Sequence, residues 1–246
     1  MNSIEQFCID NNITDYSIQN DTISVDGNVD LSHLEVEEIP YKFESVSGDF
    51  ICPKTIFSLI NVPKSCGSFS VKDCVNLKSF AGSPEEFFNF DCSGCTIEHF
   101  IDCPQSVDGT FSCNRCLALK TLEGGPVTVG ESYNCVGCDS LVSLVGAPET
   151  LNGSFYCGSC NSLQNLQGSP RQVEDFSCVY CTELKSLKGS PRKVFGNFTC
   201  SGCRSLMCLD GAPRETFGDF YCVGCGKVFT KSLFPKSSCV MKYIYY

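Results

Sequence analysis

The sequence predicts a mainly β protein that folds as a solenoid, with one parallel sheet of about ten short strands and an N-terminal cap. The phrase GSFYCGSCNSLQNLQGSPRQV at 153–173 recurs, with the same spacing of its aromatic, Cys, Leu, Gly and Pro residues, at 109–129, 131–151 and 196–216. Ten of the 11 prolines follow one another at intervals of 20 to 23 residues between positions 40 and 235. A fixed period of this length is typical of structural repeats that stack on one another.

Each repeat is expected to contain one strand, a return segment and a turn. An aromatic residue such as Phe155 lies two positions before the first cysteine, so both side chains fall on the same face of a strand. Leu163 and Leu166 follow the second cysteine and bring the chain back across the core. The final Gly-x-Pro favours a turn, because glycine permits a positive φ and proline fixes its own φ. One repeat cannot bury its apolar side alone, so the repeats must stack.

The two ends of the chain differ from the repeats, as capping units do. We place an acidic N-terminal cap at 1–47 and a solenoid of repeats of about 22 residues at 48–235. A C-terminal capping strand is expected at 236–246, where the tyrosines of VMKYIYY can cover the last coil.

The cap is predicted to start with a helix and to continue with short strands. Ser3 and Gln6 fit a capping box that opens a short helix over 3–11. The apolar side of this helix would be formed by Ile4, Phe7 and Cys8. Apolar residues then alternate with polar ones, as in strands, at Ile18, Ile23, Val25, Val29 and Leu31.

The charge of the chain is concentrated in the cap. Of 246 residues, 42% are hydrophobic and 19% charged, which is ordinary for a folded protein, and the formal net charge is −10. Residues 1–50 hold 11 acidic groups against Lys42 alone, while the other 196 residues hold 17 groups of each sign. This disfavours nucleic acid as a partner, although a carboxylate-rich cap also suits a mimic of nucleic acid.

The repeats resemble those of a known group of proteins. The pattern F-x-C-x-x-C-x-x-L-x-x-L-x-G-x-P, together with SVDGNVDLSHLEVEEIPYKFESVSGDF at 24–50, is similar to the leucine-rich-repeat-like proteins of large tailed bacteriophages and some bacteria. The resemblance implies a leucine-rich-repeat-like solenoid that serves as a recognition scaffold without general enzymatic activity, and a viral origin. The second ladder position is mostly cysteine here and often asparagine in that group, and leucine-rich repeats accept either residue.

Cysteine is the most unusual part of the composition, with 21 residues in the chain. Seven C-x-x-C pairs occur, at 92/95, 113/116, 135/138, 157/160, 178/181, 200/203 and 222/225. Two such pairs can form a tetrathiolate zinc site. However, the pairs follow the structural period, and Val71 replaces the first cysteine in one repeat, where a metal ligand could not be replaced. We therefore expect reduced thiols that pack in the core, with no metal and no cofactor. A thiolate metal-binding protein remains an alternative.

The residue types needed for catalysis are scarce. His33 and His99 are the two histidines, and neither belongs to a recognisable catalytic arrangement. No Walker-type phosphate loop occurs, so we do not expect an enzyme. The N-terminal sequence lacks the pattern of a signal peptide and no apolar run is long enough to span a membrane, which predicts a cytoplasmic protein, in the host cytoplasm if a phage encodes it.

The outward side of the predicted strands is the candidate binding face. Side chains that alternate with the aromatic and cysteine residues point outward and are mostly polar, except for two tyrosines. Residues between paired cysteines lie at turns, where variation is tolerated. Because aromatic residues and arginine are favoured at interfaces, we select Asn134, Tyr156, Tyr221, Arg115 and Tyr180. We thus predict a scaffold that binds a host or phage protein. The second hypothesis is a structural, self-associating solenoid of a viral particle.

Overall fold

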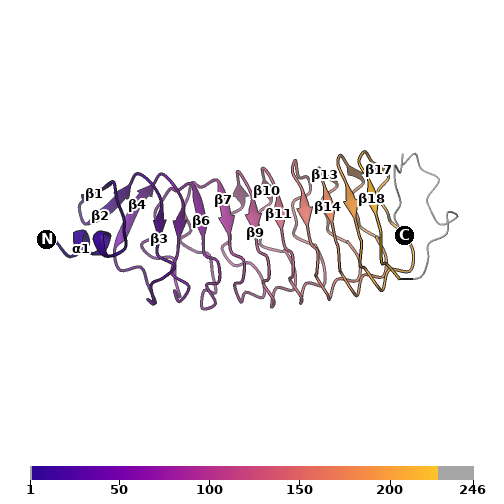
Figure 1. Ribbon diagram of the computed structural model, residues 1–246, viewed down its shortest axis with the longest axis horizontal. Helices are drawn as coiled ribbons and strands as arrows, with labels where there is room; N and C mark the ends of the chain where they lie inside the picture. Colours follow the sequence, from indigo (N-terminus) through magenta and orange to yellow (C-terminus); the bar gives the residue numbers. More distant parts are fainter. Residues whose placement is uncertain (1, 227–246) are drawn as a thin grey trace.

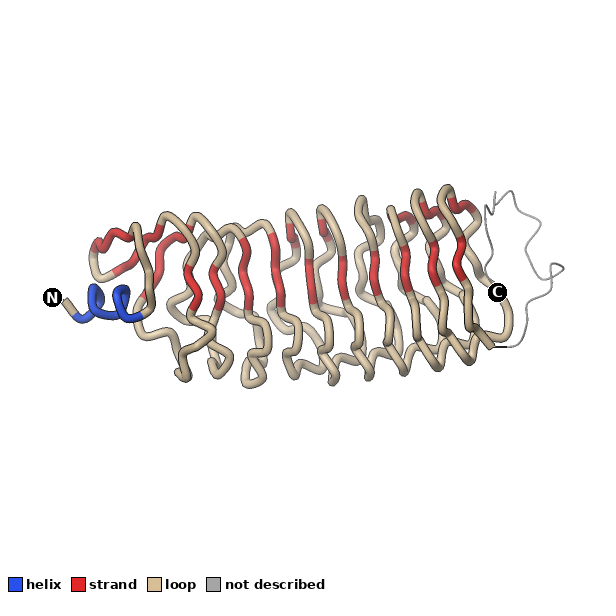
Figure 2. Tube along the Cα trace, viewed as in Figure 1, coloured by secondary structure: helices blue, strands red, loops and turns tan. Residues whose placement is uncertain are grey.

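The structure is a computed structural model, which describes residues 2–226. It is an elongated stack of coils with the cap at one end (Figure 1). One short strand from each coil joins a ten-stranded parallel sheet that runs along the stack, as Figure 2 shows. The predicted mainly β solenoid with one parallel sheet of about ten strands is therefore confirmed. The predicted capping strand at 236–246 lies outside the described residues.

The strands of the long sheet, in spatial order from the cap, are β3 (Val29–Asp30), β5 (Phe50–Ile51), β6 (Ser68–Ser70), β7 (Asn89–Asp91), β9 (Phe111–Ser112), β11 (Tyr133–Asn134), β12 (Phe155–Tyr156), β14 (Phe176–Ser177), β16 (Phe198–Thr199) and β18 (Phe220–Tyr221). Each aromatic residue pairs with the aromatic residue of the next coil, as Phe155 does with Phe176. The rings therefore form a stack inside the core, with centroids 5.7 Å apart for this pair. The register is uniform because a slip of one residue would expose every ring.

Tyr133 is an exception within this stack, since the other strands carry phenylalanine or valine at its position. The ring is fully buried between Phe111 and Phe155. Its hydroxyl has no hydrogen-bond partner in the described part of the chain. A buried hydroxyl without a partner destabilises the folded state by about 1–3 kcal/mol.

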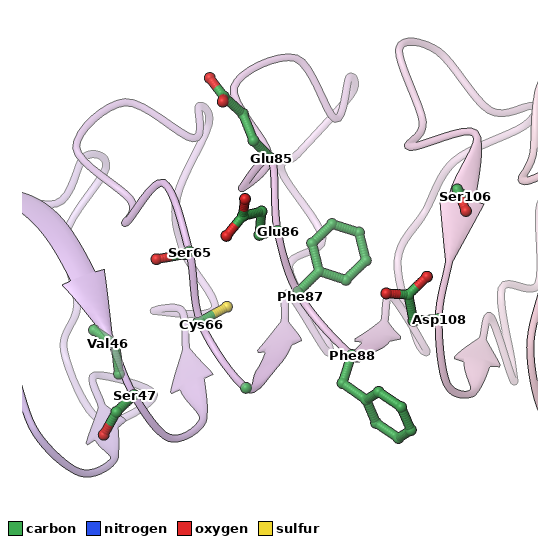
Figure 3. Close-up of a pocket in the computed structure, with 11 residues that line it drawn as sticks. Val46, Ser47, Ser65, Cys66, Glu85, Glu86, Phe87, Phe88, Ser106 and Asp108 are labelled. Atoms are coloured by element: carbon green, nitrogen blue, oxygen red, sulfur yellow. The ribbon is translucent and has the colours of Figure 1, made fainter.

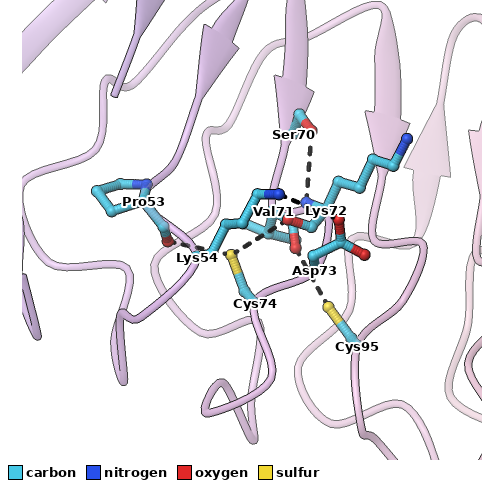
Figure 4. Close-up of polar contacts among 8 residues, drawn as sticks. All are labelled: Pro53, Lys54, Ser70, Val71, Lys72, Asp73, Cys74 and Cys95. Atoms are coloured by element: carbon cyan, nitrogen blue, oxygen red, sulfur yellow. Dashed lines mark hydrogen bonds and ion pairs between the residues drawn. The ribbon is translucent and has the colours of Figure 1, made fainter. Parts of the chain in front are cut away.

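The cysteine at the second ladder position, which is Cys74 in the coil of β6 and the second cysteine of each pair in later coils, has a specific bonding role in the core. Its thiol donates to a backbone carbonyl in the preceding coil, as Cys160 does to Cys135 at 3.1 Å. Figure 4 shows the first two of these bonds, from Cys74 to Pro53 and from Cys95 to Val71, at 3.3 and 3.2 Å. An asparagine amide could donate to the same carbonyl. Either residue can therefore make this bond between coils.

Short strands also form on a second side of the coils, just before the long sheet. They are β8 (Ser106–Val107), β10 (Thr128–Val129), β13 (Gln172–Val173), β15 (Lys193–Val194) and β17 (Glu215–Thr216). β8 pairs with β10, and β13, β15 and β17 form a parallel sheet. The sequence analysis did not predict these strands, because each is only two residues long and carries a single buried side chain.

Hydrogen bonding on this second side is interrupted near the cap. Ser45, Ser65 and Glu86 are joined by parallel bridges, but in the described structure no pairing joins Glu86 to Ser106. The break opens a hollow of about 620 Å³, into which Phe87 and Asp108 point (Figure 3). It leaves two local sheet edges within the stack.

The cap begins with α1 (Ser3–Asp10), which buries Ile4 and Cys8. The predicted capping box at Ser3 and Gln6 is wrong by one residue: the side chain of Asn2 accepts from the Ile4 N–H, and Glu5 accepts from the Asn2 N–H. Both Asn-x-x-Glu and Ser-x-x-Gln are capping patterns, and the helix uses the earlier pair. The predicted helix also extends one residue too far, since Asn11 is its C-cap.

After α1, β1 (Tyr16–Gln19) and β2 (Thr22–Val25) form an antiparallel hairpin, and β2 pairs with β4 (Lys42–Val46) in parallel. Ile23, Val25 and Phe43 of this small sheet are buried. β3 follows the hairpin but belongs to the long sheet. The cap and the solenoid therefore share one continuous core.

Candidate binding face

The outer side of the long sheet is formed by the second residue of most of its strands. Asn134 and Tyr156 lie next to each other here because β11 pairs with β12. The Asn134 amide donates to Ser112 at 3.2 Å, which fixes its orientation. Tyr221 lies three strands further along, and its hydroxyl donates to Asp219 at 2.9 Å. The structure therefore places Asn134 and Tyr156 together and Tyr221 apart.

The turn after each strand imposes a left-handed backbone conformation on the residue before the second cysteine. Glycine takes this position in several coils, as Gly137 does with a φ of 74°. Arg115, Ser159 and Tyr180 adopt φ values of 57°, 57° and 59° at the same position. For a residue with a Cβ atom, this conformation costs about 1–2 kcal/mol. Arg115 and Tyr180 thus occupy strained positions, where glycine would be favoured.

The side chains of these two strained residues lie along the surface of the next coil. The Arg115 stem packs over Gly137, where an added Cβ would be 3.3 Å from the arginine Cγ. The Tyr180 ring packs over Gly202 in the same way. Tyr180 nevertheless keeps 64% of its surface exposed. Both side chains are therefore supported from below and presented to the outside.

A hollow of about 590 Å³ lies on this face across four coils, and we call it the Gly158 groove. Its lining consists of Asn114, Arg115, Asn134, Val136, Tyr156, Gly158, Ser177 and Val179. Three of the five predicted binding residues, Arg115, Asn134 and Tyr156, thus line one site. Tyr180 follows the lining residue Val179 without lining the groove itself, and Tyr221 does not belong to it.

At Gly158, on the floor of the groove, one side chain is missing from a row, and Val179 of the next coil covers this position, so Gly158 is itself buried. Other coils carry a serine, asparagine, lysine or valine between the first cysteine position and the left-handed residue. Gly158 has no positive φ that would require glycine. Sequence reasoning missed Gly158, Val136 and Val179. The sequence did contain a signal for Gly158. In C-G-S-C at 157–160 glycine is the second residue of the motif, whereas in the other C-x-x-C pairs that contain glycine it is the third.

The same row supplies hydrogen-bond acceptors between neighbouring coils. Ser93 accepts from the Asn114 N–H at 3.1 Å, and Asn114 accepts from the Val136 N–H at 2.8 Å. Further along, Ser201 accepts from the Val223 N–H at 3.1 Å. Between these bonds the row offers no acceptor. The Gly158, Val179 and Ser201 N–H groups accordingly have no hydrogen-bond partner among residues 2–226, and the first two belong to residues that line the groove.

The cysteines lie below this face, in the core, and are free thiols in the described residues. Burial raises the pKa of Cys92 and of Cys113 far above its ordinary value, and raises the pKa of Cys74 to about 12. Thiolates, the form that binds metals, are therefore disfavoured at neutral pH. Within residues 2–226, no group of three or more potential ligands is arranged to hold a metal ion.

The two histidines lie apart from the groove. His33 is in the cap, where Nε2 is 3.0 Å from the Asn11 side-chain oxygen, and His99 is exposed in the coil that follows β7. Among the described residues no helix is both long and apolar enough to cross a membrane. Comparison of the chain with protein-family models, with curated proteins and with solved structures gave no match.

Proposed function

We propose that this protein is a non-enzymatic scaffold that binds another protein through the outer face of its long sheet, at the Gly158 groove. The observation that carries the proposal is the grouping of Arg115, Asn134 and Tyr156 around one hollow. Aromatic residues and arginine contribute most to protein interfaces when they surround such a pocket. A rigid row of coils also holds these side chains in fixed positions, which reduces the entropy lost on binding.

The resemblance of the repeats to phage-encoded leucine-rich-repeat-like proteins supports a setting for this interaction. In that setting the protein acts in the cytoplasm of a bacterium infected by the phage that encodes it. Its partner is then a host or phage protein whose activity it modulates.

The test uses a substitution that adds a side chain to the floor of the groove. In Gly158→Ser, the new hydroxyl can accept from the Val179 N–H, as Ser201 does from Val223. An added Cβ would meet Val179 Cγ2 at 2.9 Å and the Val179 backbone oxygen at 3.1 Å, so both the side chain and the backbone of Val179 must shift slightly. Lys72→Ser is the matched control, because Lys72 holds the equivalent place in the coil of β6.

Tagged wild-type protein and both variants would be used to capture partners from a lysate of phage-infected bacteria. We expect a protein that the wild type and Lys72→Ser retain and that Gly158→Ser loses. Thermal unfolding of each variant must show an unchanged fold. A set of captured proteins that is the same for all three would refute the groove as the binding site.

A further inference from the structure

We propose that the Gly158 groove binds an acidic side chain, aspartate or glutamate, of the protein partner. The carboxylate would replace the acceptor that the row of turn side chains lacks at Gly158. This inference rests on the proposed function and names the chemistry of the group that the groove recognises. It draws on the unpaired backbone donors, on the charge of the lining and on the shape of the groove.

The backbone donors define where the carboxylate oxygen would sit. In the coils of Ser93, Asn114 and Ser201, a side-chain oxygen accepts the N–H of the following coil. At Gly158 that oxygen is absent. The place of the missing Cβ is 3.7 Å from the Val179 nitrogen but also 2.9 Å from Val179 Cγ2 and 3.1 Å from the Val179 carbonyl oxygen, so the Val179 side chain must turn aside before an oxygen can reach the N–H from this place. An oxygen supplied by a partner at this place would accept the Val179 N–H as the Ser201 oxygen accepts that of Val223. The repeat itself thus shows the geometry of the bond.

The charge of the lining favours an anion over a neutral amide. Arg115 is the one cation among the lining residues, and no carboxylate lines the groove. Arg115 is exposed and forms no ion pair with any described residue. Hydrogen bonds between a charged donor and a carboxylate are about twice as strong as those between neutral groups. The Tyr156 and Ser177 hydroxyls add further donors at the walls.

The apolar walls fit the methylene groups that carry the carboxylate. Val136 and Val179 flank Gly158 along the row, and Tyr156 of β12 lines the same groove. An aspartate or glutamate side chain can lie between the valines with its oxygens on the N–H donors. A lysine or arginine would meet Arg115 and would leave the N–H donors without an acceptor, so basic segments are disfavoured.

The experiment follows backbone amide resonances by NMR in full-length, isotope-labelled protein. The probe is the capped tripeptide acetyl-Gly-Asp-Gly-amide, and acetyl-Gly-Asn-Gly-amide is its neutral control. We expect a saturable downfield shift of the Val179 amide proton, with a dissociation constant of roughly 1–10 mM for so small a ligand. The neutral tripeptide should bind at least about fivefold more weakly.

Three variants locate the site. Arg115→Asn removes the charge and keeps a residue that tolerates a positive φ, and should weaken binding at least about fivefold. Gly158→Ser should shift the Val179 amide resonance without peptide and abolish the response to it. Lys72→Ser should bind like the wild type. Absence of a saturable shift, or equal binding of both tripeptides, would overturn the inference.

The outcomes also separate this inference from the proposed function. If Gly158→Ser abolishes partner capture but the aspartate tripeptide causes no shift, the carboxylate is wrong and the binding groove stands. If the tripeptide binds as expected but partner capture does not depend on Gly158, the groove recognises carboxylates and the proposed function is refuted.

Discussion

The thiol-filled core predicts a sharp loss of stability in mild alkali. Fourteen of the described cysteines have a pKa raised above the ordinary value of 9.0. Burial is the first cause in most of them, whereas for Cys135, Cys178 and Cys200 contact with a neighbouring thiol comes first, followed by burial. In the unfolded chain the same thiols ionise near pH 9. The unfolded state therefore loses protons that the folded state keeps.

The size of the effect follows from linkage between ionisation and unfolding. Stability from these groups is fully present below the unfolded pKa and falls as the pH rises above it. Each thiol that ionises only in the unfolded chain lowers the free energy of unfolding by about 0.4 kcal/mol at pH 9 and about 1.4 kcal/mol at pH 10. Fourteen thiols that all stay protonated in the fold would give at most about 6 and about 20 kcal/mol. The pKa of Cys138 and of Cys225, which hydrogen bonds with Cys113 and Cys200 lower, acts in the opposite sense. Since a domain is stable by about 5–15 kcal/mol, we expect unfolding between pH 9 and pH 10.

The assay is urea unfolding followed by far-ultraviolet circular dichroism, from pH 7 to pH 10.5, with a reductant present throughout. The double variant Cys157→Val and Cys178→Val is the control, because Val71 already occupies the equivalent core position in another coil. Removing two of the thiols should recover about 3 kcal/mol at pH 10. A urea midpoint that is the same at pH 7 and pH 10 would refute the reasoning. Such a result would mean that burial does not keep these thiols protonated in the folded state.

Three further predictions concern other parts of the molecule. Tyr133→Phe should raise the free energy of unfolding by about 1 kcal/mol, because it removes a buried hydroxyl without a partner; urea unfolding measures this, and a destabilised variant would contradict it. Arg115→Gly should stabilise the fold by about 0.5–1 kcal/mol by relieving the positive φ, while weakening partner capture; a loss of stability would show that the turn is not strained. At the break beside Glu86, the amide hydrogens of Phe87 and Ser106 should exchange with solvent much faster than those of the long sheet. Strong protection of both would mean that the ladder is closed there.

The sequence alone was sufficient for the ladders of the core. The alternation around Phe155 and Cys157 has the period of a strand, and the 22-residue repeat sets which residues stack. It was not sufficient for the second side of the coils. Pairs such as Gln172–Val173 are too short and too polar to show a periodic pattern, and they form strands only because neighbouring coils hold them in register.

The sequence predicted only part of the candidate site, because the groove depends on how the coils stack. Outward positions such as Asn134 and Tyr156 follow from the strand period, and Arg115 was selected for its residue type. That Arg115 is strained depends on a backbone angle, which the glycine of most other coils suggests but does not prove. The groove itself arises from residues of four different coils, so it can be recognised only when the coils are stacked.

The departures from the repeat around the groove favour a functional origin over a structural one. Arg115 stands where glycine would relieve strain, and Gly158 stands where serine would supply a missing acceptor. The positive φ of Arg115 makes the fold less stable, and glycine already occurs at this position in other coils, as Gly137 shows. Both departures line one hollow that also presents Tyr156. Local strain and unpaired polar groups are common at functional sites. Binding uses such groups, whereas selection for stability alone would replace them. A surface selected only for stability would have used glycine at position 115.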